Sequence, residues 1–288
     1  MAFSILRNRG SGFALKRTKI TSMPTAHING IRLYYETHGT GPAVVLSHGL
    51  GSNHLHWWQQ VPLLAKHFQV ITFDQRGFGF STDDGSGPDS FVDDLIGLLD
   101  HLEIKSAALV GQSMGGFTVA GVASLQPKRV TALVLSSTPA GLVAPRPLAQ
   151  RVREHLAAAT DYPSLAHLLI HQDGFPQRKP QLCFLCEQMT QLNRDVDMRT
   201  LSTLATMRHD PLPIKAAAIP LLLIGGEEDE GAHAAMREIS DLFLGSSLLQ
   251  IVPNAGHLLF FEDAESYNRL IGDFLAQTLQ PRSANLVT

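Results

Sequence analysis

A serine and a histidine of this sequence lie where acyl-transfer chemistry would need them. Ser113 is the centre of Gly-Gln-Ser-Met-Gly, a G-x-S-x-G pattern at positions 111–115. A serine hydroxyl is a weak nucleophile at its ordinary pKa and is activated by an adjacent base. Among the thirteen histidines, His257 is distinguished because it follows the last apolar run and precedes the last helical stretch. The two residues together indicate nucleophilic attack on a carbonyl carbon.

An imidazole base needs an acid that orients it and stabilises its protonated form. The apolar run at 220–224 is followed by Gly-Gly-Glu-Glu-Asp-Glu at positions 225–230. A row of acidic residues is usually a solvated loop, but one carboxylate at this point would serve the base. We assign Asp229 to this role, and Glu227 and Glu228 stay open as alternatives.

The negative oxygen that forms during such an attack needs N–H donors held ready for it. We predict that one donor is the backbone amide of Met114, directly after the nucleophile. The second is expected from Ser-His-Gly-Leu-Gly at positions 47–51, where we assign the backbone amide of Leu50. His48 in the same segment could also be taken for a base, but we expect it to brace the loop.

The elements that position these loops are predicted from hydrophobic patterning. Apolar runs without alternation are typical of strands buried on both faces of a parallel sheet, and they lie at 43–47, 69–73, 107–110, 130–136, 220–224 and 248–252. Helical stretches lie between them, at 56–67, 91–102 and 114–125, and another, 262–279, follows the last run. Asn29-Gly30 between alternating apolar residues predicts an opening β-hairpin. This order indicates an α/β fold with a mostly parallel, doubly wound sheet.

A stretch without evident strands, 139–213, interrupts the alternation. Its helical segments are separated by prolines and cannot lie inside the sheet. We therefore predict a helical cap above the carboxyl ends of the strands, where ligands bind in open α/β sheets, with 25–138 and 214–281 as the core. The residues expected to line a substrate pocket are Trp57, Phe175, Phe184, Met189 and Leu258. For Trp57, packing against a helix is an equal alternative.

Composition and charge exclude several functional classes. The net charge of −3 is spread along the 288 residues, which gives no electrostatic basis for binding nucleic acid. The longest apolar run, 219–224, is too short to span a membrane. Cys183 and Cys186 are too few for a disulfide scaffold, so a cytoplasmic, reducing compartment is the default. Their C-x-x-C spacing also fits zinc or redox chemistry, but no second ligand pair is evident, and we expect packing on a helix at 181–192 and no metal or organic cofactor.

Residues 1–24 are predicted to be a flexible basic extension outside the fold. Positions 1–22 contain five lysines and arginines and no acidic residue. A basic, serine-containing, acid-poor start is also typical of a transit peptide. A start codon assigned too early is a further alternative, because Met23 precedes the first predicted strand.

Five motifs in chain order resemble those of the α/β-hydrolase superfamily. They are His48-Gly49, Asp74-Gln-Arg76-Gly77 with the residues up to Ser81, 111–116, 226–229 and Gly256-His257. The resemblance runs from about position 25 to 279 outside the cap. It implies the α/β-hydrolase fold with an inserted cap, a triad of Ser113, Asp229 and His257 in the superfamily's chain order, and oxyanion donors at Leu50 and Met114. The loop that contains Asp74 and Arg76 is implied to be structural.

Within the superfamily the core is most similar to 3-oxoadipate enol-lactonases and related carboxylesterases, on 112–116 and on Asp74-x-Arg76-Gly77. It also resembles hydrolases that cleave carbon–carbon bonds of ring-fission products. Ser113 departs from haloalkane dehalogenases and epoxide hydrolases, which use aspartate. The resemblance implies hydrolysis of a small carboxylic ester or lactone. The sequence leaves open whether the protein is a monomer or a homodimer. Carbon–carbon bond hydrolysis, a perhydrolase and a slow or non-catalytic ligand receptor are the alternatives.

Overall fold

The computed structural model describes residues 24–144, 170–193 and 198–279. The predicted N-terminal extension, apart from its last residue, and two parts of the predicted cap, 145–169 and 194–197, lie outside the described residues. Over the described residues no helix is both long and apolar enough to cross a membrane.

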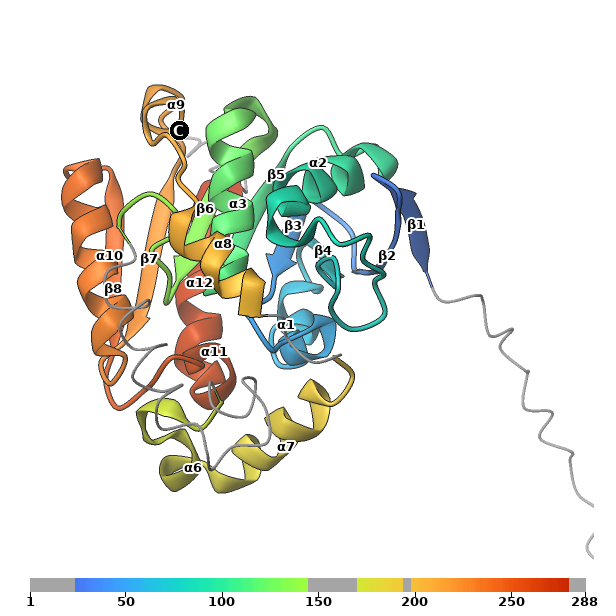
Figure 1. The fold of residues 1–288 in the computed structure, drawn as a ribbon. Helices are drawn as coiled ribbons and strands as arrows, with labels where there is room; N and C mark the ends of the chain where they lie inside the picture. The colour runs from blue at the N-terminus through green and yellow to red at the C-terminus, as the bar shows by residue number, and fades with distance from the viewer. Residues whose placement is uncertain (1–23, 145–169, 194–197, 280–288) are drawn as a thin grey trace, which may run out of the picture.

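The described chain forms one eight-stranded sheet in the order β1-β2-β4-β3-β5-β6-β7-β8 (Figure 1). The strands are β1 (Thr25–Ile28), β2 (Ile31–His38), β3 (Ala43–Ser47), β4 (Gln69–Phe73), β5 (Ala107–Gln112), β6 (Val130–Ser136), β7 (Leu221–Gly226) and β8 (Ser247–Val252). β2 pairs antiparallel with β1 and β4, and the remaining pairs are parallel. Asn29 and Gly30 both have positive φ, 47° and 80°, as a tight hairpin turn requires. The predicted hairpin and doubly wound sheet are confirmed.

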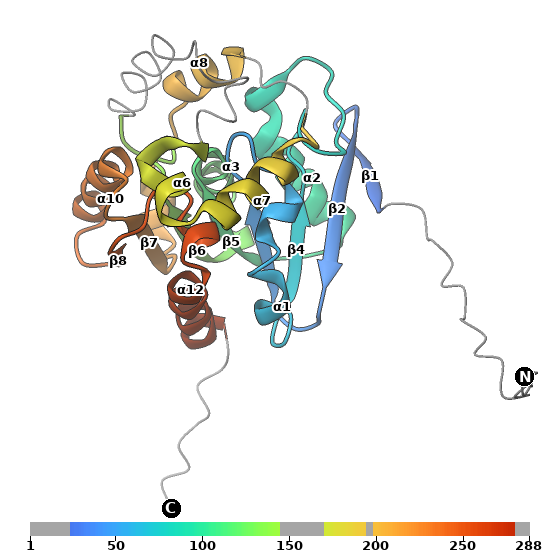
Figure 2. The same ribbon diagram turned by 90° about the horizontal axis from the view of Figure 1, so that it is seen from below.

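Helices cover both faces of the sheet (Figures 1 and 2). One apolar cluster joins the sheet to α2 (Phe91–His101), α3 (Met114–Leu125) and α10 (Glu230–Phe243). A second cluster joins the opposite face to α1 (Val61–Leu64), α11 (Leu259–Glu262) and α12 (Ala264–Leu279). Along β5 the residues alternate between the clusters, with Leu109 in the first and Val110 in the second. The central strands are therefore buried on both faces, as their continuous apolar runs predict.

Two predicted helices are broken in the structure. The stretch 56–67 forms a short 3₁₀ helix, η1 (His54–Trp57), and then α1. Asn53 caps η1 through its side chain, and Pro62 falls in the first turn of α1, where its missing N–H is tolerated. The stretch 262–279 is divided at Asp263, whose φ of −127° and ψ of 67° separate α11 from α12.

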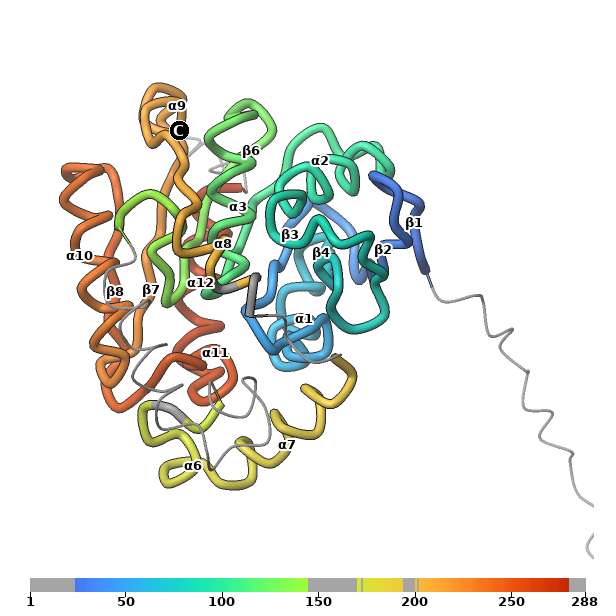
Figure 3. Tube along the Cα trace, viewed as in Figure 1, coloured from blue at the N-terminus to red at the C-terminus, as the bar shows by residue number. Residues whose placement is uncertain are grey.

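Between β6 and β7 the described residues include only helical elements. These are η5 (Gln172–Gly174), α6 (Phe175–Arg178), α7 (Pro180–Thr190), α8 (Met198–Thr206) and α9 (Leu212–Ala216). α6 and α7 lie across the carboxyl ends of the central strands (Figures 1 and 2), where α7 contacts η1 and α11. The trace in Figure 3 shows α9 returning beside α3 before β7 begins.

Candidate active site

Ser113 lies on a strained turn between β5 and α3. Its φ of 50° and ψ of −116° are costly for a residue with a Cβ atom. Flanking glycines allow the strand and helix to approach: a Cβ atom on Gly111 would lie 2.5 Å from the Gly115 carbonyl oxygen, and one on Gly115 would lie 2.1 Å from the Ser47 carbonyl oxygen. α3 begins at Met114, so the positive end of its dipole lies at the serine. This is the geometry of a nucleophile elbow.

The three side chains singled out from the sequence lie in one hydrogen-bonded row. His257 Nε2 is 3.0 Å from Ser113 Oγ, and His257 Nδ1 is 2.6 Å from Asp229 Oδ2. With the ring proton on Nδ1, the imidazole donates to the carboxylate and accepts from the serine hydroxyl. Asp229 is 2% exposed and its other oxygen accepts from the Ala232 amide at 3.2 Å as the N-cap of α10.

The alternatives to Asp229 point elsewhere. Glu227 and Glu228 are exposed, and Glu227 accepts from the backbone amide of Asn254 at 3.2 Å. Burial separates the three neighbouring carboxylates, because only the one at position 229 faces the imidazole from inside the protein.

The segment 47–51, which is predicted to supply an oxyanion donor and is called the oxyanion loop below, passes beside the nucleophile. A Cβ atom built on Gly49 would lie 3.2 Å from Ser113 Cβ, so the backbone at positions 49–50 is next to the serine. Leu50 also packs against the apolar cluster that contains Met114. The amide of Met114 is among the first N–H groups of α3, which have no acceptor within the helix. The structure therefore brings the two residues predicted to supply the donors, Leu50 and Met114, close to Ser113.

His48 holds the oxyanion loop in place through hydrogen bonds. Its Nδ1 donates to the Gly49 carbonyl at 2.8 Å, and its Nε2 accepts from the Gln75 amide at 3.0 Å. Burial lowers the pKa of His48 to about 4, so the ring is neutral and can both donate and accept. Gln75 returns a bond to the His48 carbonyl at 2.8 Å. These are the contacts of a brace, as the sequence analysis expects.

The loop after β4 is held by buried charges. Asp74 accepts from the His54 amide at 2.7 Å and from the Phe80 amide at 2.8 Å. Arg76 is buried and donates twice to Asp94, at 2.8 Å each. None of these bonds reaches the serine, which agrees with a structural role for the loop.

Two side chains that the sequence analysis missed hold the loop of the base. Glu262 is 3% exposed and accepts from the Gly256 amide at 2.9 Å, next to His257. The same carboxylate pairs with Arg178 of α6, so an ion pair joins the cap to this loop. Gln112 donates to the His257 carbonyl at 3.2 Å. The Glu262–Arg178 pair joins residues 84 positions apart, a contact that sequence pattern alone does not reveal.

A small pocket opens beside His257. Among the described residues, those that line it are Leu50, Gly51, Ser52, Gln112, Ile170, His257 and Leu258. Of the five pocket residues predicted from the sequence, Leu258 is in this set. Ile170 of the cap was missed.

The four other predicted pocket residues lie elsewhere. Trp57 is fully buried and packs on Phe260, with ring centroids 4.7 Å apart, so the packing alternative describes it. Phe175 is 2% exposed and packs against the ring of Phe261, whereas Phe184 is 62% exposed. Met189 accepts a bond from Asn53 through its carbonyl and packs against the core. A side chain in the cap can thus be apolar and still face the core or the solvent instead of the pocket.

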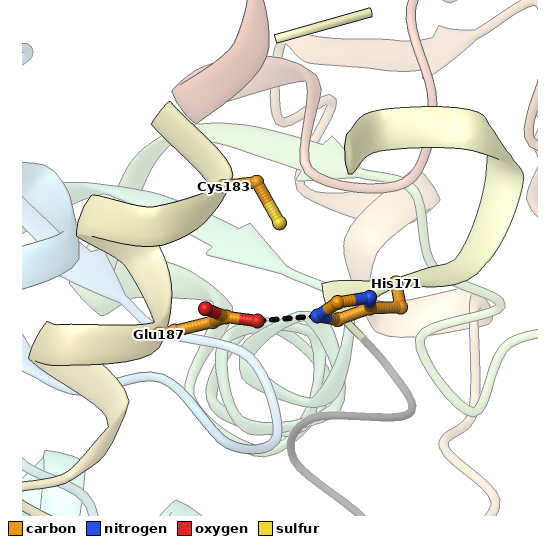
Figure 4. A group of neighbouring side chains, drawn as sticks. All are labelled: His171, Cys183 and Glu187. Atoms are coloured by element: carbon orange, nitrogen blue, oxygen red, sulfur yellow. Dashed lines mark hydrogen bonds and ion pairs between the residues drawn. The ribbon is translucent and has the colours of Figure 1, made fainter. Parts of the chain in front are cut away.

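Both cysteines are free, buried and on one side of α7, as plain packing predicts. Burial raises the pKa of Cys183 to about 11. Cys183 lies beside an ion pair between His171 and Glu187 (Figure 4). The ligand atoms of these three residues lie within 4.8 Å of one another, a set that suits a borderline divalent cation. The imidazole and carboxylate already satisfy each other as a pair.

Comparison with known proteins agrees with this architecture. The family model described as the alpha/beta hydrolase fold matches residues 42–208. The chain is 29% identical over 250 residues to 3-oxoadipate enol-lactonase 2 of Acinetobacter baylyi, covering 84% of this chain and 92% of that protein. It is 30% identical over 269 residues to 2-hydroxymuconate semialdehyde hydrolase of a Pseudomonas species, covering 86% and 92%.

Among solved structures, the enol-lactonase of Burkholderia xenovorans LB400 superposes with a TM-score of 0.70 at 27% identity, covering 88% of this chain and all of that chain. A thermophilic esterase of Thermogutta terrifontis gives a TM-score of 0.73 at 24% identity, covering 90% and 100%, which speaks for the fold alone. With the sheet order, the elbow and these matches in agreement, the chain belongs to the α/β-hydrolase fold family.

Proposed function

We propose that this protein is a serine hydrolase that cleaves a small carboxylic ester or lactone through an acyl-enzyme. The observation that carries the proposal is the row from Ser113 through His257 to Asp229, with distances of 3.0 and 2.6 Å. The nucleophile, the base and the acid come from three separate loops, and few structural roles require that arrangement. We also propose that residues 139–213 form the cap over this site.

The first step forms the acyl-enzyme. Ser113 Oγ attacks the carbonyl carbon while its proton passes to His257 Nε2, and the Asp229 carboxylate stabilises the resulting imidazolium. The backbone amides of Leu50 and Met114 donate hydrogen bonds to the carbonyl oxygen and stabilise the negative charge that develops on it. The tetrahedral intermediate then collapses, and His257 gives its proton to the leaving alkoxide. With a lactone, this alkoxide stays attached to the acyl group.

The second step releases the acid. Water adds to the acyl carbon while His257 takes its proton, and the new tetrahedral intermediate expels Ser113 with that proton. All the groups required are side chains and amides of the chain itself, so the proposal needs no metal or organic cofactor.

The substrate class is supported by the pocket and by the relatives. Leu50, Ile170 and Leu258 give the described pocket an apolar lining beside the histidine. Of the relatives reported above, two are named as enol-lactonases. A compact, fairly apolar acyl group fits both observations.

Ser113→Ala tests the proposal directly. The variant should keep the fold, because Ser113 Oγ contributes only the bond to His257 among the described contacts. It should lose turnover of p-nitrophenyl acetate and butyrate by at least about 10⁴-fold. The wild-type protein should also be labelled by a fluorophosphonate probe, and the variant should not. Unchanged ester turnover in Ser113→Ala would contradict the proposal.

A second candidate is hydrolysis of a carbon–carbon bond in a ring-fission product, which the 30% identity to 2-hydroxymuconate semialdehyde hydrolase favours. The same triad would serve both reactions. A panel that sets p-nitrophenyl esters and simple lactones against a ring-fission dienoate, at equal concentrations, separates them by kcat/KM.

A further inference from the structure

We propose that Asn193, in the cap, is a positioning residue that sets the direction of an oxyanion-hole amide through a chain of hydrogen bonds. The inference rests on the proposed function, because it assigns a task to the Leu50 amide. Asn193 lies three residues beyond the end of α7. Its side chain crosses from the cap to the loops of the core, at the point where the predicted oxyanion loop runs.

The side-chain amide of Asn193 is fully engaged. Its Nδ2 donates to the Gly51 carbonyl at 2.7 Å and to the Ser52 carbonyl at 3.2 Å. Its Oδ1 accepts from the Gly79 amide at 2.9 Å and from Asn53 Nδ2 at 3.4 Å. Donors thus meet carbonyls, and the acceptor meets N–H groups, so the orientation of the amide is the one its neighbours require.

The hydrogen bond from Asn193 to the Gly51 carbonyl is the first of a series that leads toward the active site. In a trans peptide the C=O of one residue and the N–H of the next point in opposite directions. The Gly51 carbonyl that accepts from Asn193 therefore belongs to the same peptide plane as the Ser52 amide. That amide donates to the Gly49 carbonyl at 3.1 Å. The Gly49 carbonyl in turn shares its peptide plane with the Leu50 amide.

The result is an aligned row of dipoles that begins at Asn193 and ends at the N–H of Leu50. Each hydrogen bond in such a row polarises the next, so the last N–H becomes a better donor. The row also fixes the plane of the final peptide, because its carbonyl is held by both Ser52 and His48. Since the backbone at Gly49 passes beside Ser113, the direction of the Leu50 amide is the quantity that Asn193 sets.

Asn193→Asp is the sharpest perturbation. The side chain keeps its size and its acceptor toward Gly79, but a carboxylate oxygen replaces the donor that faces the Gly51 and Ser52 carbonyls. The row then loses its first donor and gains a repulsive contact. Gln188→Glu is the matched control, because it makes the same amide-to-carboxylate change at an exposed position of α7.

The kinetic arm uses p-nitrophenyl butyrate with sites counted by fluorophosphonate titration, so that unfolded protein does not enter the result. Asn193→Asp should lower kcat per site by about 10- to 100-fold and leave KM within about threefold, because the donor acts mainly on the transition state. Inhibition by an alkyl trifluoromethyl ketone, whose adduct places an oxyanion in the hole, should weaken in step with kcat. If Asn193 only stabilised the fold, the substitution would lower the folded fraction but leave kcat per site and inhibition by the ketone unchanged. Gln188→Glu should behave as wild type.

The second arm does not depend on catalysis. Hydrogen–deuterium exchange of the backbone at 48–55 should be faster in Asn193→Asp than in Gln188→Glu. The Ser52 amide, which donates to the Gly49 carbonyl, shares its peptide plane with the Gly51 carbonyl, and that carbonyl loses the hydrogen bond from Asn193. If Ser113→Ala kept full turnover, the proposed function would fall while this arm still reported on the hydrogen-bond row. The inference itself is overturned if exchange at 48–55 is unchanged, or if kcat per site of Asn193→Asp stays within about twofold of wild type.

Discussion

Replacing Gly115 with alanine tests how closely the elbow is packed against the oxyanion loop. The new Cβ atom would lie 2.1 Å from the Ser47 carbonyl oxygen, 2.5 Å from its carbonyl carbon and 2.7 Å from the His48 carbonyl oxygen. All three atoms belong to the backbone, so no side-chain rotation relieves the contact. Either α3 or the end of β3, with the oxyanion loop that follows it, must move.

The size of the effect follows from these distances. Ordinary van der Waals contact begins at 3.4 Å, so the closest contact must open by roughly 1 Å. Overpacking of this kind costs about 1–3 kcal/mol, partly offset by the better helix propensity of alanine. The melting temperature should therefore fall by about 2–8 °C. Because the displaced segment carries an oxyanion donor, kcat should fall by roughly 100-fold.

Gly272→Ala is the matched control for this prediction. Gly272 lies inside α12, where a Cβ atom would meet no heavy atom within 4 Å. The same substitution there should stabilise the protein by about 0.5–1 kcal/mol, since alanine loses less backbone entropy in a helix. Thermal unfolding and p-nitrophenyl ester turnover of both variants form the assay. If Gly115→Ala matched Gly272→Ala in melting temperature and kcat, the close-approach argument would be refuted.

Further predictions concern the base, the buried charges and the cap. Asp229→Asn keeps a side-chain acceptor for the Ala232 amide but removes the charge that stabilises the imidazolium, so kcat should fall by roughly 10³- to 10⁴-fold with little change in melting temperature. Because the pKa of His48 is about 4 in the fold against an ordinary 6.5, the unfolded chain binds the proton first as the pH falls. The stability that neutral His48 contributes to the fold is therefore complete above pH 6.5 and is lost toward pH 4, by up to about 3 kcal/mol. Urea midpoints that stayed constant between pH 6.5 and pH 4 would contradict this prediction. Glu262→Gln removes the negative charge that pairs with Arg178. The free energy of unfolding should fall by about 1–3 kcal/mol, which thermal unfolding would measure. Dialysis against a chelator should leave ester turnover within about twofold, because each proposed catalytic step uses groups of the chain itself. If turnover falls, the same treatment of Cys183→Ser shows whether the loss depends on the possible cation ligands His171, Cys183 and Glu187.

The local pattern of the sequence determined most of the sheet. The runs at 43–47, 69–73 and 130–136 coincide with β3, β4 and β6, and 114–125 coincides with α3. Strands buried on both faces are apolar at most positions, so each appears in the sequence as a short, nearly continuous apolar run. The G-x-S-x-G pattern identified the elbow for a similar reason, because a tight strand-to-helix turn needs small residues at fixed positions around the serine.

The tertiary structure decided what depends on contacts between distant residues. Sequence left three neighbouring carboxylates open, and burial against His257 selected Asp229. From the sequence, Trp57 could equally line the pocket or pack in the core, and the structure shows it packed on Phe260. Nothing in the sequence indicated that Asn193 would reach the carbonyl of Gly51, 142 positions away. Periodicity reports which side chains avoid water, but hydrogen bonds between loops depend on how the whole chain brings those loops together.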